Sequence, residues 1–349
     1  MRSSYHKDDV VLLLKDITGL VEPQSTEERE RLIQGGRHYC EMLPVEYVPS
    51  SRYMEIYREA LEQFSEPTAM AVGVLADKII KLKGETVVLV SLARAGIPIG
   101  ILLKHYIQMK YGKDVKHYAI SIIRGKGIDG NAMKFLLKRH RPEDLLFVDG
   151  WIGKGAILNE LIKEIAKYKG VLSDIAVLAD PANVTDLCGT HEDILIPSSC
   201  LNSTVSGLVS RTFLRSDIIG ENDFHGAVYY EELKDVDLSY EFLHAIESKF
   251  MMKPIKQEEK PKGFGIDEVR KLAAEYKIKD INLIKPGIGE TTRVLLRRVP
   301  WKVLINETYK EDPALAHIIR LAQEKKVSIE YYPLIHYKAC GIIKNMADT

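Results

Sequence analysis

The stretch Leu145-Leu-Phe-Val-Asp-Gly-Trp-Ile-Gly-Lys-Gly-Ala156 decides the fold. An apolar run ends at Asp149, and a glycine-rich turn then leads into residues 154–169, whose apolar positions have helical spacing. A strand that passes through glycines into an amphipathic helix is typical of a βα unit in a parallel sheet. Loops after such strands share one edge of the sheet, which is where ligands bind.

The same alternation of strand and helix runs through the first 200 residues. We expect further strands at residues 85–91, 115–123, 175–179 and 194–197, and helices at residues 68–81, 98–111 and 131–139. The sequence therefore predicts an α/β domain with a doubly wound parallel sheet and helices on both faces.

A polar segment with two prolines, residues 251–263, reads as a linker. It separates a first domain with an N-terminal extension, residues 1–250, from a small α/β domain at residues 264–349. In the second domain we expect helices at residues 267–277, 289–297 and 313–325, and strands at residues 281–284, 301–305 and 328–332.

Charge divides at the same place, although the 49 basic and 49 acidic residues of the whole chain cancel. Residues 1–250 hold 30 Lys and Arg against 36 Asp and Glu, a balance of −6. Residues 251–349 hold 19 against 13, a balance of +6, so a nucleic-acid partner would bind the second domain.

Scattered cysteines and the absence of a secretory or membrane-spanning apolar run favour a cytoplasmic protein without membrane contact. The four cysteines form no CxxC and no zinc spacing. The fold class often assembles, so a homo-oligomer is expected as well.

Two loops after predicted strands could hold phosphate through backbone N–H groups and a helix N-terminus. In the first, Arg94 would add a cationic fork, and the phosphate-binding residues would be Ser91, Ala93, Ala95 and Gly96. In the second, Asp149 could orient ribose hydroxyls, and the phosphate-binding residues would be Gly150, Gly153, Lys154, Gly155 and Ala156. A third, glycine-rich loop at residues 121–130 could close as a lid with Arg124 and Lys126. The alternative for each loop taken alone is a structural turn, although the length and glycines of the second loop favour a functional role.

Together, the three loops resemble those of type I phosphoribosyltransferases. That resemblance implies catalysis with Asp149, Arg94, Arg124 and Lys126, the substrate phosphoribosyl diphosphate or a nucleotide, and Mg²⁺ bound through the diphosphate. Gly150 stands where that family has a second acid, and Lys154-Gly155 stands where it has Thr-Gly.

A narrower resemblance covers nearly the whole chain. The segments Gly36-Arg-His-Tyr-Cys-Glu-Met-Leu-Pro44, Pro67-Thr-Ala-Met-Ala-Val-Gly-Val-Leu75 and Ser91-Leu-Ala-Arg-Ala-Gly-Ile-Pro-Ile-Gly100 are similar to the StiP family. These phosphoribosyltransferase-like proteins of bacterial tellurium-resistance and stress operons are often named cysteine proteases. The resemblance thus implies a fold and an activity that disagree.

The segment around Cys200 bears on the protease alternative. Cys200 precedes a predicted helix, where a thiol pKa is lowered, and His225 is a candidate base. A polar loop at a strand end could instead grip substrate through Asn202, Ser203 and Thr204. A small buried residue in a polar cap is a third interpretation of Cys200.

The second domain resembles the Pelota C-terminal and kink-turn-binding ribosomal-protein family. There, a glycine turn leads into an RNA-contacting helix, and a late small-residue loop follows, here residues 339–341. The resemblance, with the basic helix, implies RNA contacts by Lys285, Gly287, Gly289, Glu290, Thr292, Arg293, Arg297 and Arg298.

The leading hypothesis from the sequence is a phosphoribosyltransferase-like enzyme of a tellurite or stress response, with an RNA-binding domain. One alternative is a non-catalytic, nucleotide-sensing regulator of RNA, which Gly150 in place of an acid favours. The other is a cysteine peptidase that uses Cys200 and His225.

Overall fold

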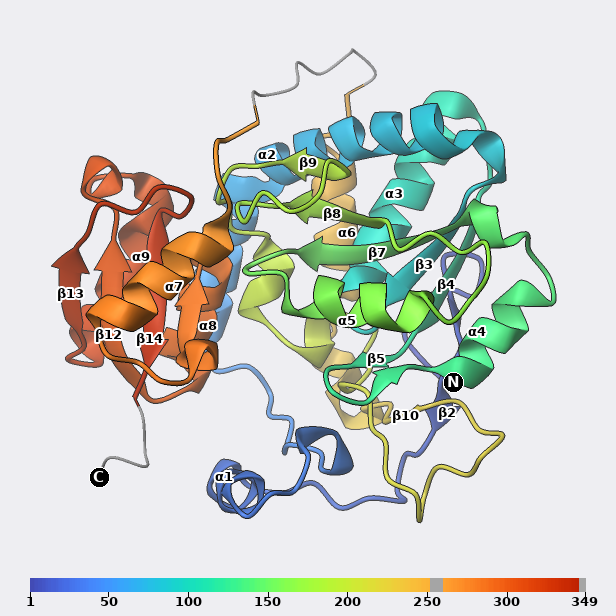
Figure 1. The fold of residues 1–349 in the computed structure, drawn as a ribbon, viewed down its shortest axis with the longest axis horizontal. Coiled ribbons are helices and arrows are strands. Elements are labelled where there is room, and N and C mark those ends of the chain that lie inside the picture. The colour runs from blue at the N-terminus through green and yellow to red at the C-terminus, as the bar shows by residue number, and fades with distance from the viewer. Residues whose placement is uncertain (252–259, 345–349) are drawn as a thin grey trace.

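The computed structural model describes residues 1–251 and 260–344. Two α/β parts lie side by side, the second at the left in Figure 1. Most of the predicted linker, residues 252–259, lies outside the described residues. The domain boundaries at residues 250 and 264 stay a prediction.

The larger sheet has six strands, and all its neighbours pair in parallel. In sheet order they are β1 (Val11–Leu12), β4 (Lys116–Ile120), β3 (Val88–Leu92), β7 (Leu145–Trp151), β8 (Ile175–Ala179) and β9 (Cys188–Thr190). The prediction of a parallel α/β sheet is confirmed.

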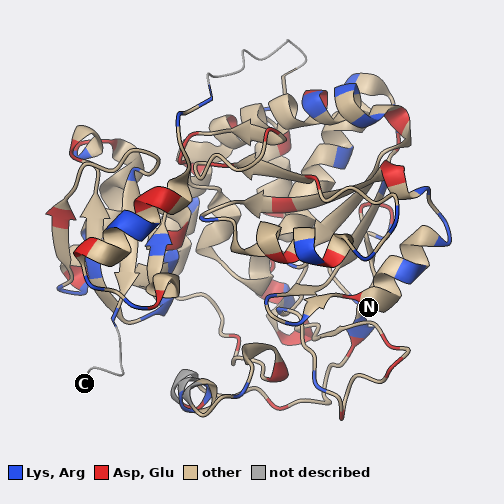
Figure 2. Cartoon of the chain, viewed as in Figure 1, with Lys and Arg blue, Asp and Glu red and all other residues tan. Residues whose placement is uncertain are grey.

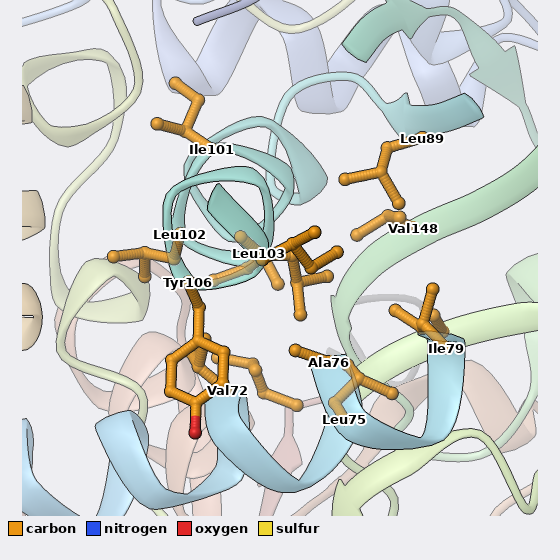
Figure 3. Close-up of a cluster of buried hydrophobic side chains, with 14 of the residues drawn as sticks. Val72, Leu75, Ala76, Ile79, Leu89, Ile101, Leu102, Leu103, Tyr106 and Val148 are labelled. Atoms are coloured by element: carbon orange, nitrogen blue, oxygen red, sulfur yellow. The ribbon is translucent and has the colours of Figure 1, made fainter. Parts of the chain in front are cut away.

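Helices cover both faces of this sheet (Figure 1). One face packs against α2 (Ser51–Lys83), α3 (Gly96–Tyr111) and α6 (Ser239–Glu247). The other packs against α4 (Gly130–Leu137) and α5 (Ala156–Ile165). Figure 3 shows part of the first core, to which α2 contributes Val72, Leu75, Ala76 and Ile79, and α3 contributes Leu102, Leu103 and Tyr106.

Smaller elements surround the sheet. The hairpin of β5 (Ile122–Ile123) and β6 (Gly127–Ile128) follows β4, and β2 (Lys15–Asp16) pairs with β10 (Gly226–Ala227). The N-terminal segment adds α1 (Thr26–Gln34). No helix in the described ranges is long and apolar enough to cross a membrane.

The second part has a four-stranded sheet and three helices. In sheet order the strands are β11 (Ile284–Pro286), β14 (Ala339–Ile343), β12 (Pro300–Ile305) and β13 (Ser328–Tyr331), and the helices are α7 (Gly265–Glu275), α8 (Ile288–Arg297) and α9 (Ala316–Glu324). Basic and acidic residues are interspersed along both parts (Figure 2).

Three predicted elements differ from the structure. Residues 194–197 form no strand, and the edge strand is β9 instead. The strand predicted at residues 281–284 is a 3-10 turn over Ile281–Leu283, and β11 begins only at Ile284. Helix α2 begins 17 residues before the predicted start at Thr68 and passes through Pro67. The half of α2 before Pro67 remains helical because Tyr57 and Phe64 pack into a core that also contains Leu295 of α8. Tertiary packing therefore outweighs the local cost of the proline.

Candidate functional site

The loop after β3 is held by bonds within the protein. The Ser91 hydroxyl, fully buried, donates to the Gly96 carbonyl at 2.8 Å and lies 2.7 Å from Nε2 of His117. A side chain at Gly96 would place its Cβ 2.4 Å from the Val148 carbonyl oxygen. Ser91 and Gly96 thus fix the start of α3 against β7. Ala93 and Ala95 lie in the turn between β3 and α3.

Arg94 is linked to the second part of the chain through Asn202. Its guanidinium donates to the Val209 carbonyl at 2.9 Å and to Oδ1 of Asn202 at 3.0 Å. Arg297 of α8 donates to the same Asn202 oxygen at 2.5 Å and to the Cys200 carbonyl at 2.7 Å. Asn202 therefore bridges two arginines from different parts of the chain.

The other two predicted substrate residues, Ser203 and Thr204, are buried. Ser203 donates from its backbone N–H at 3.0 Å and its hydroxyl at 2.8 Å to Oε1 of Glu46.

Asp149 lies near the end of β7, where burial raises the pKa of its carboxyl group to about 7. Its Oδ1 accepts the backbone N–H of Gly150 at 2.8 Å. Arg293 of α8 is a cation close enough to oppose this rise in the pKa, and its guanidinium lies 5.8 Å from the ring of Trp151.

The loop at residues 153–156 faces the second part of the chain. Lys154 donates its ammonium to the carbonyls of Ile281 at 2.6 Å and Ile284 at 2.9 Å. Burial, with a smaller contribution from Lys285, lowers the pKa of Lys154 to about 8. The Gly153 carbonyl accepts the Tyr337 hydroxyl at 2.7 Å. Gly155 (φ 85°) leads into α5, which begins at Ala156.

The predicted lid is the β5–β6 hairpin, and its Arg124, Gly125 and Lys126 are exposed. Arg124 donates to Oδ1 of Asn282 at 2.9 Å, and the Gly125 N–H donates to Glu160 at 2.8 Å.

The structure does not pair Cys200 with His225. Burial raises the pKa of the Cys200 thiol to about 12. Nδ1 of His225 instead lies 2.8 Å from the Ser121 hydroxyl, and its backbone N–H donates to Asp129 at 2.6 Å. Cys200 packs in an apolar core that contains Leu295 and Val303.

Two other cysteines do have a histidine partner, and our sequence analysis missed both as sites. Nδ1 of His38 lies 2.9 Å from Sγ of Cys40, and Nε2 of His191 lies 3.4 Å from Sγ of Cys188. Short spacings, His-x-Cys and Cys-x-x-His, were the available signal. We had considered only the histidines near Cys200.

Helix α8, the predicted RNA-binding helix, faces the first part of the chain. Gly289 lies against Ser199. Glu290 lies close to Gly153, and Gly287 lies close to Asp193. Burial raises the pKa of Asp193 to about 6.

The remaining predicted RNA contacts differ in their access to solvent. Thr292 is buried, donates to the Ile288 carbonyl at 2.8 Å and lies 2.7 Å from Nε2 of His317. Burial lowers the pKa of Lys285. Arg298 is exposed.

Within residues 1–251 and 260–344, no group of three or more His, Cys, Asp or Glu residues could hold a metal ion. Mg²⁺ was expected through a diphosphate substrate rather than through such a group, and it stays a prediction.

Comparisons with known proteins identify two families. Residues 3–247 match the model "Tellurite-like stress resistance cysteine protease StiP", and residues 264–345 match "PELOTA RNA binding domain". The protein named "Cysteine protease StiP" from Acinetobacter baylyi is 37% identical over 363 residues, covering 98% of this chain and 94% of that protein.

Solved structures give only a distant likeness. A hypoxanthine-guanine phosphoribosyltransferase from Bacillus anthracis is 16% identical, with a TM-score of 0.25 over 42% of this chain and 80% of its own. A purine phosphoribosyltransferase from Pyrococcus horikoshii is 17% identical, with a TM-score of 0.18 over 38% of this chain and 77% of its own. At these scores the likeness supports no conclusion about activity.

The family match overturns the leading prediction of a phosphoribosyltransferase, because the family and the relative are both named as cysteine proteases. The contacts give a physical reason. Arg94 and Lys154, which were to hold phosphates, donate to carbonyl and amide oxygens of the protein itself. Binding of phosphoribosyl diphosphate or a nucleotide and assembly into a homo-oligomer are untested, as is the regulator alternative.

The match over residues 3–247, together with 37% identity along nearly the whole chain, shows that this protein belongs to the StiP family.

Proposed function

We propose that the protein is a cysteine peptidase in which Cys40 is the nucleophile and His38 is the general base. The observation that carries the proposal is the 2.9 Å separation between Nδ1 of His38 and Sγ of Cys40. This replaces Cys200 and His225 as the candidate pair. The names of the family and of the Acinetobacter relative support the same reaction class.

Hydrogen bonds around His38 favour the tautomer that a general base needs. Nε2 lies 3.1 Å from the Arg124 carbonyl, which can only accept, so Nε2 carries the proton. Nδ1 is then an acceptor. It accepts the backbone N–H of Cys40 at 3.3 Å and lies 2.9 Å from Sγ of Cys40, which also lies 3.6 Å from the Leu214 carbonyl. The Arg124 carbonyl would thus orient the base, as the third member of a catalytic triad does.

Charged groups of both signs act on the Cys40 thiol. Burial, and after it the negative charge of Glu41, raise the pKa of this thiol, whereas Lys126 and Arg211 act to lower it. Arg211 donates to the Tyr39 carbonyl, between the two reacting residues, and its guanidinium lies 5.1 Å from the Tyr39 ring. Lys126 and Arg211 are thus the groups that would stabilise the thiolate once the proton has passed to His38, because nearby cations lower the pKa of a thiol.

The other histidine-paired thiol is a weaker candidate. Burial raises the pKa of Cys188 to about 12, and Cys188 packs with Val177 and Ala182 in the apolar core. Its base, His191, is 3.4 Å away through Nε2, while Nδ1 lies 3.0 Å from the Asp180 carbonyl. Because this pair also has an oriented histidine, Cys188 is the natural comparison in an experiment.

In the proposed reaction, Nδ1 of His38 takes the thiol proton and Sγ of Cys40 attacks the carbonyl carbon of a peptide bond. The C–N bond then breaks, His38 returns the proton to the leaving amine, and an acyl thioester remains on Cys40. Water, deprotonated by His38, hydrolyses the thioester and releases the acid. Cys40 is fully buried, and its Sγ lies between His38 and the Leu214 carbonyl, so substrate entry requires the surrounding segments to move.

We also propose that the second part of the chain binds RNA. The match to the PELOTA RNA binding domain and the basic balance of residues 251–349 support this role. The exposed Arg298 beyond α8 is suited to phosphate contact.

The test of the peptidase is hydrolysis of unfolded casein by the full chain and by Cys40→Ser, Cys188→Ser and Cys200→Ser variants. We expect Cys40→Ser to abolish cleavage while the other two retain it. Loss in Cys188→Ser alone would move the nucleophile to that residue. Equal cleavage by all three variants, or none by the wild type, would overturn the proposal.

A further inference from the structure

Asp193 lies between the two parts of the chain and is 5% exposed. Its carboxylate accepts the backbone N–H of Ile288, at 2.9 Å through Oδ1 and 3.1 Å through Oδ2. Oδ2 also accepts the backbone N–H of Lys338 at 2.9 Å. One side chain of the first part thus uses two backbone donors of the second.

These donors come from both segments for which the sequence predicts RNA contact. Ile288 is the first residue of α8, directly after the glycine turn, and Lys338 directly precedes the loop at residues 339–341. The Gly287 N–H donates to the Ala339 carbonyl at 2.8 Å and holds the two segments together. A Cβ at Gly287 (φ 97°) would lie 3.1 Å from Oδ1 of Asp193, so the glycine permits this close approach.

A carboxylate at a helix N-terminus uses the donors and the dipole that a phosphate would use. Asp193 therefore stands where a backbone phosphate of RNA would be bound. Two further residues of α8 lie in the same contact, because Gly289 lies against Ser199, and Arg297 donates to Cys200 and Asn202.

We propose that the first part of the chain and RNA compete for the N-terminal face of α8, with Asp193 in the place of an RNA phosphate. This rests on the proposed RNA binding of the second part. In the docked arrangement the face is covered, so RNA binds only after the two parts separate there. The apparent affinity is the intrinsic affinity multiplied by the fraction of undocked molecules.

A disulfide can test this directly because Cβ of Ser199 lies 3.7 Å from the position of a Cβ on Gly289. That separation suits a disulfide bond. In the full-chain double variant Ser199→Cys/Gly289→Cys, oxidation should hold the two parts docked. We expect the oxidised form to lose binding to a fluorescent bulged RNA hairpin and the reduced form to regain it.

A second variant removes the charge without adding bulk. Asp193→Asn should bind the same hairpin about 10-fold more tightly than the wild type, a change of about 1.4 kcal/mol. Asp174→Asn, which removes the same charge at an exposed position of the first part, should leave affinity unchanged. Equal affinity of the oxidised and reduced forms, with Asp193→Asn like the wild type, would refute competition while leaving RNA binding intact. Absence of binding in every form, including Asp193→Asn, would overturn RNA binding itself.

Discussion

Nδ1 of His38 lies 2.9 Å from Sγ of Cys40, although neither residue belongs to the parallel sheet. The pair sits at a short 3-10 turn, Tyr39–Glu41, for which His38 is the N-cap. Its partner Arg124 comes from the β5–β6 hairpin, 86 positions away in the sequence from His38. The candidate site therefore joins the N-terminal extension to the sheet's loops.

His38→Gln should slow alkylation of Cys40 by iodoacetamide. Without the base, the thiol loses its proton acceptor, and a rise of one unit in the thiol pKa lowers the rate at pH 7 about 10-fold. The difference should shrink as the pH rises through the pKa of the Cys40 thiol in each protein. Peptide mass spectrometry can follow Cys40 alone.

His191→Gln is the matched control, because it removes the partner of Cys188 and leaves Cys40 untouched. Equal Cys40 rates in wild type and His38→Gln across this pH range would show that His38 does not act on the thiol.

Much of the fold could be predicted because its strands are apolar runs with glycine or polar ends. The predicted strand at residues 175–179 is β8 without change, and residues 289–297 are nearly all of α8. Strand β14 was missed, because Ala339-Cys-Gly-Ile-Ile343 has no polar alternation and its glycine resembles a loop.

The site was harder to predict because its contacts join distant segments. Arg94 and Lys154 were predicted to bind phosphate after strand ends, but Arg94 donates to Asn202 and the Val209 carbonyl, and Lys154 to carbonyls of the second part. A single sequence shows which charged groups need hydrogen-bond partners. It does not show which acceptor each group binds in the folded protein. The same limit applied to Cys200, whose neighbouring histidine in sequence is bound elsewhere.

Gly96→Ala should destabilise the protein strongly, whereas Gly150→Ala should not. A Cβ added at Gly96 would lie 2.4 Å from the Val148 carbonyl oxygen. A Cβ added at Gly150 would have its nearest neighbour, the Ala95 carbonyl oxygen, at 3.8 Å. Relief of the first clash requires α3 to move from β7, at a cost of about 1–3 kcal/mol. Urea unfolding of both variants would measure it, and equal midpoints would contradict the packing role of Gly96.

Asn202→Ala should lower the free energy of unfolding by about 1–3 kcal/mol, because Arg94 and Arg297 lose a shared acceptor. Asn159→Ala, on an exposed face of α5, is the control and should change stability little. If Asn202 served only to bind substrate, as the sequence suggested, both variants would unfold at the wild-type urea concentration.

Asp149→Asn should stabilise the protein more at pH 8.5 than at pH 5. Burial raises the pKa of Asp149 to about 7, so the folded protein holds a proton there that the unfolded chain has lost above about pH 4. This contribution to stability is complete below that pH and is lost as the pH rises through 7. Asparagine avoids the buried charge, and we expect its advantage in Tm to grow by about 3 °C or more between the two pH values.

Asp144→Asn is the control, because hydrogen bonding to Arg141 lowers the pKa of Asp144 and keeps it ionised throughout this range. An Asp149→Asn advantage that is the same at both pH values would show that Asp149 is already ionised in the folded protein at pH 5.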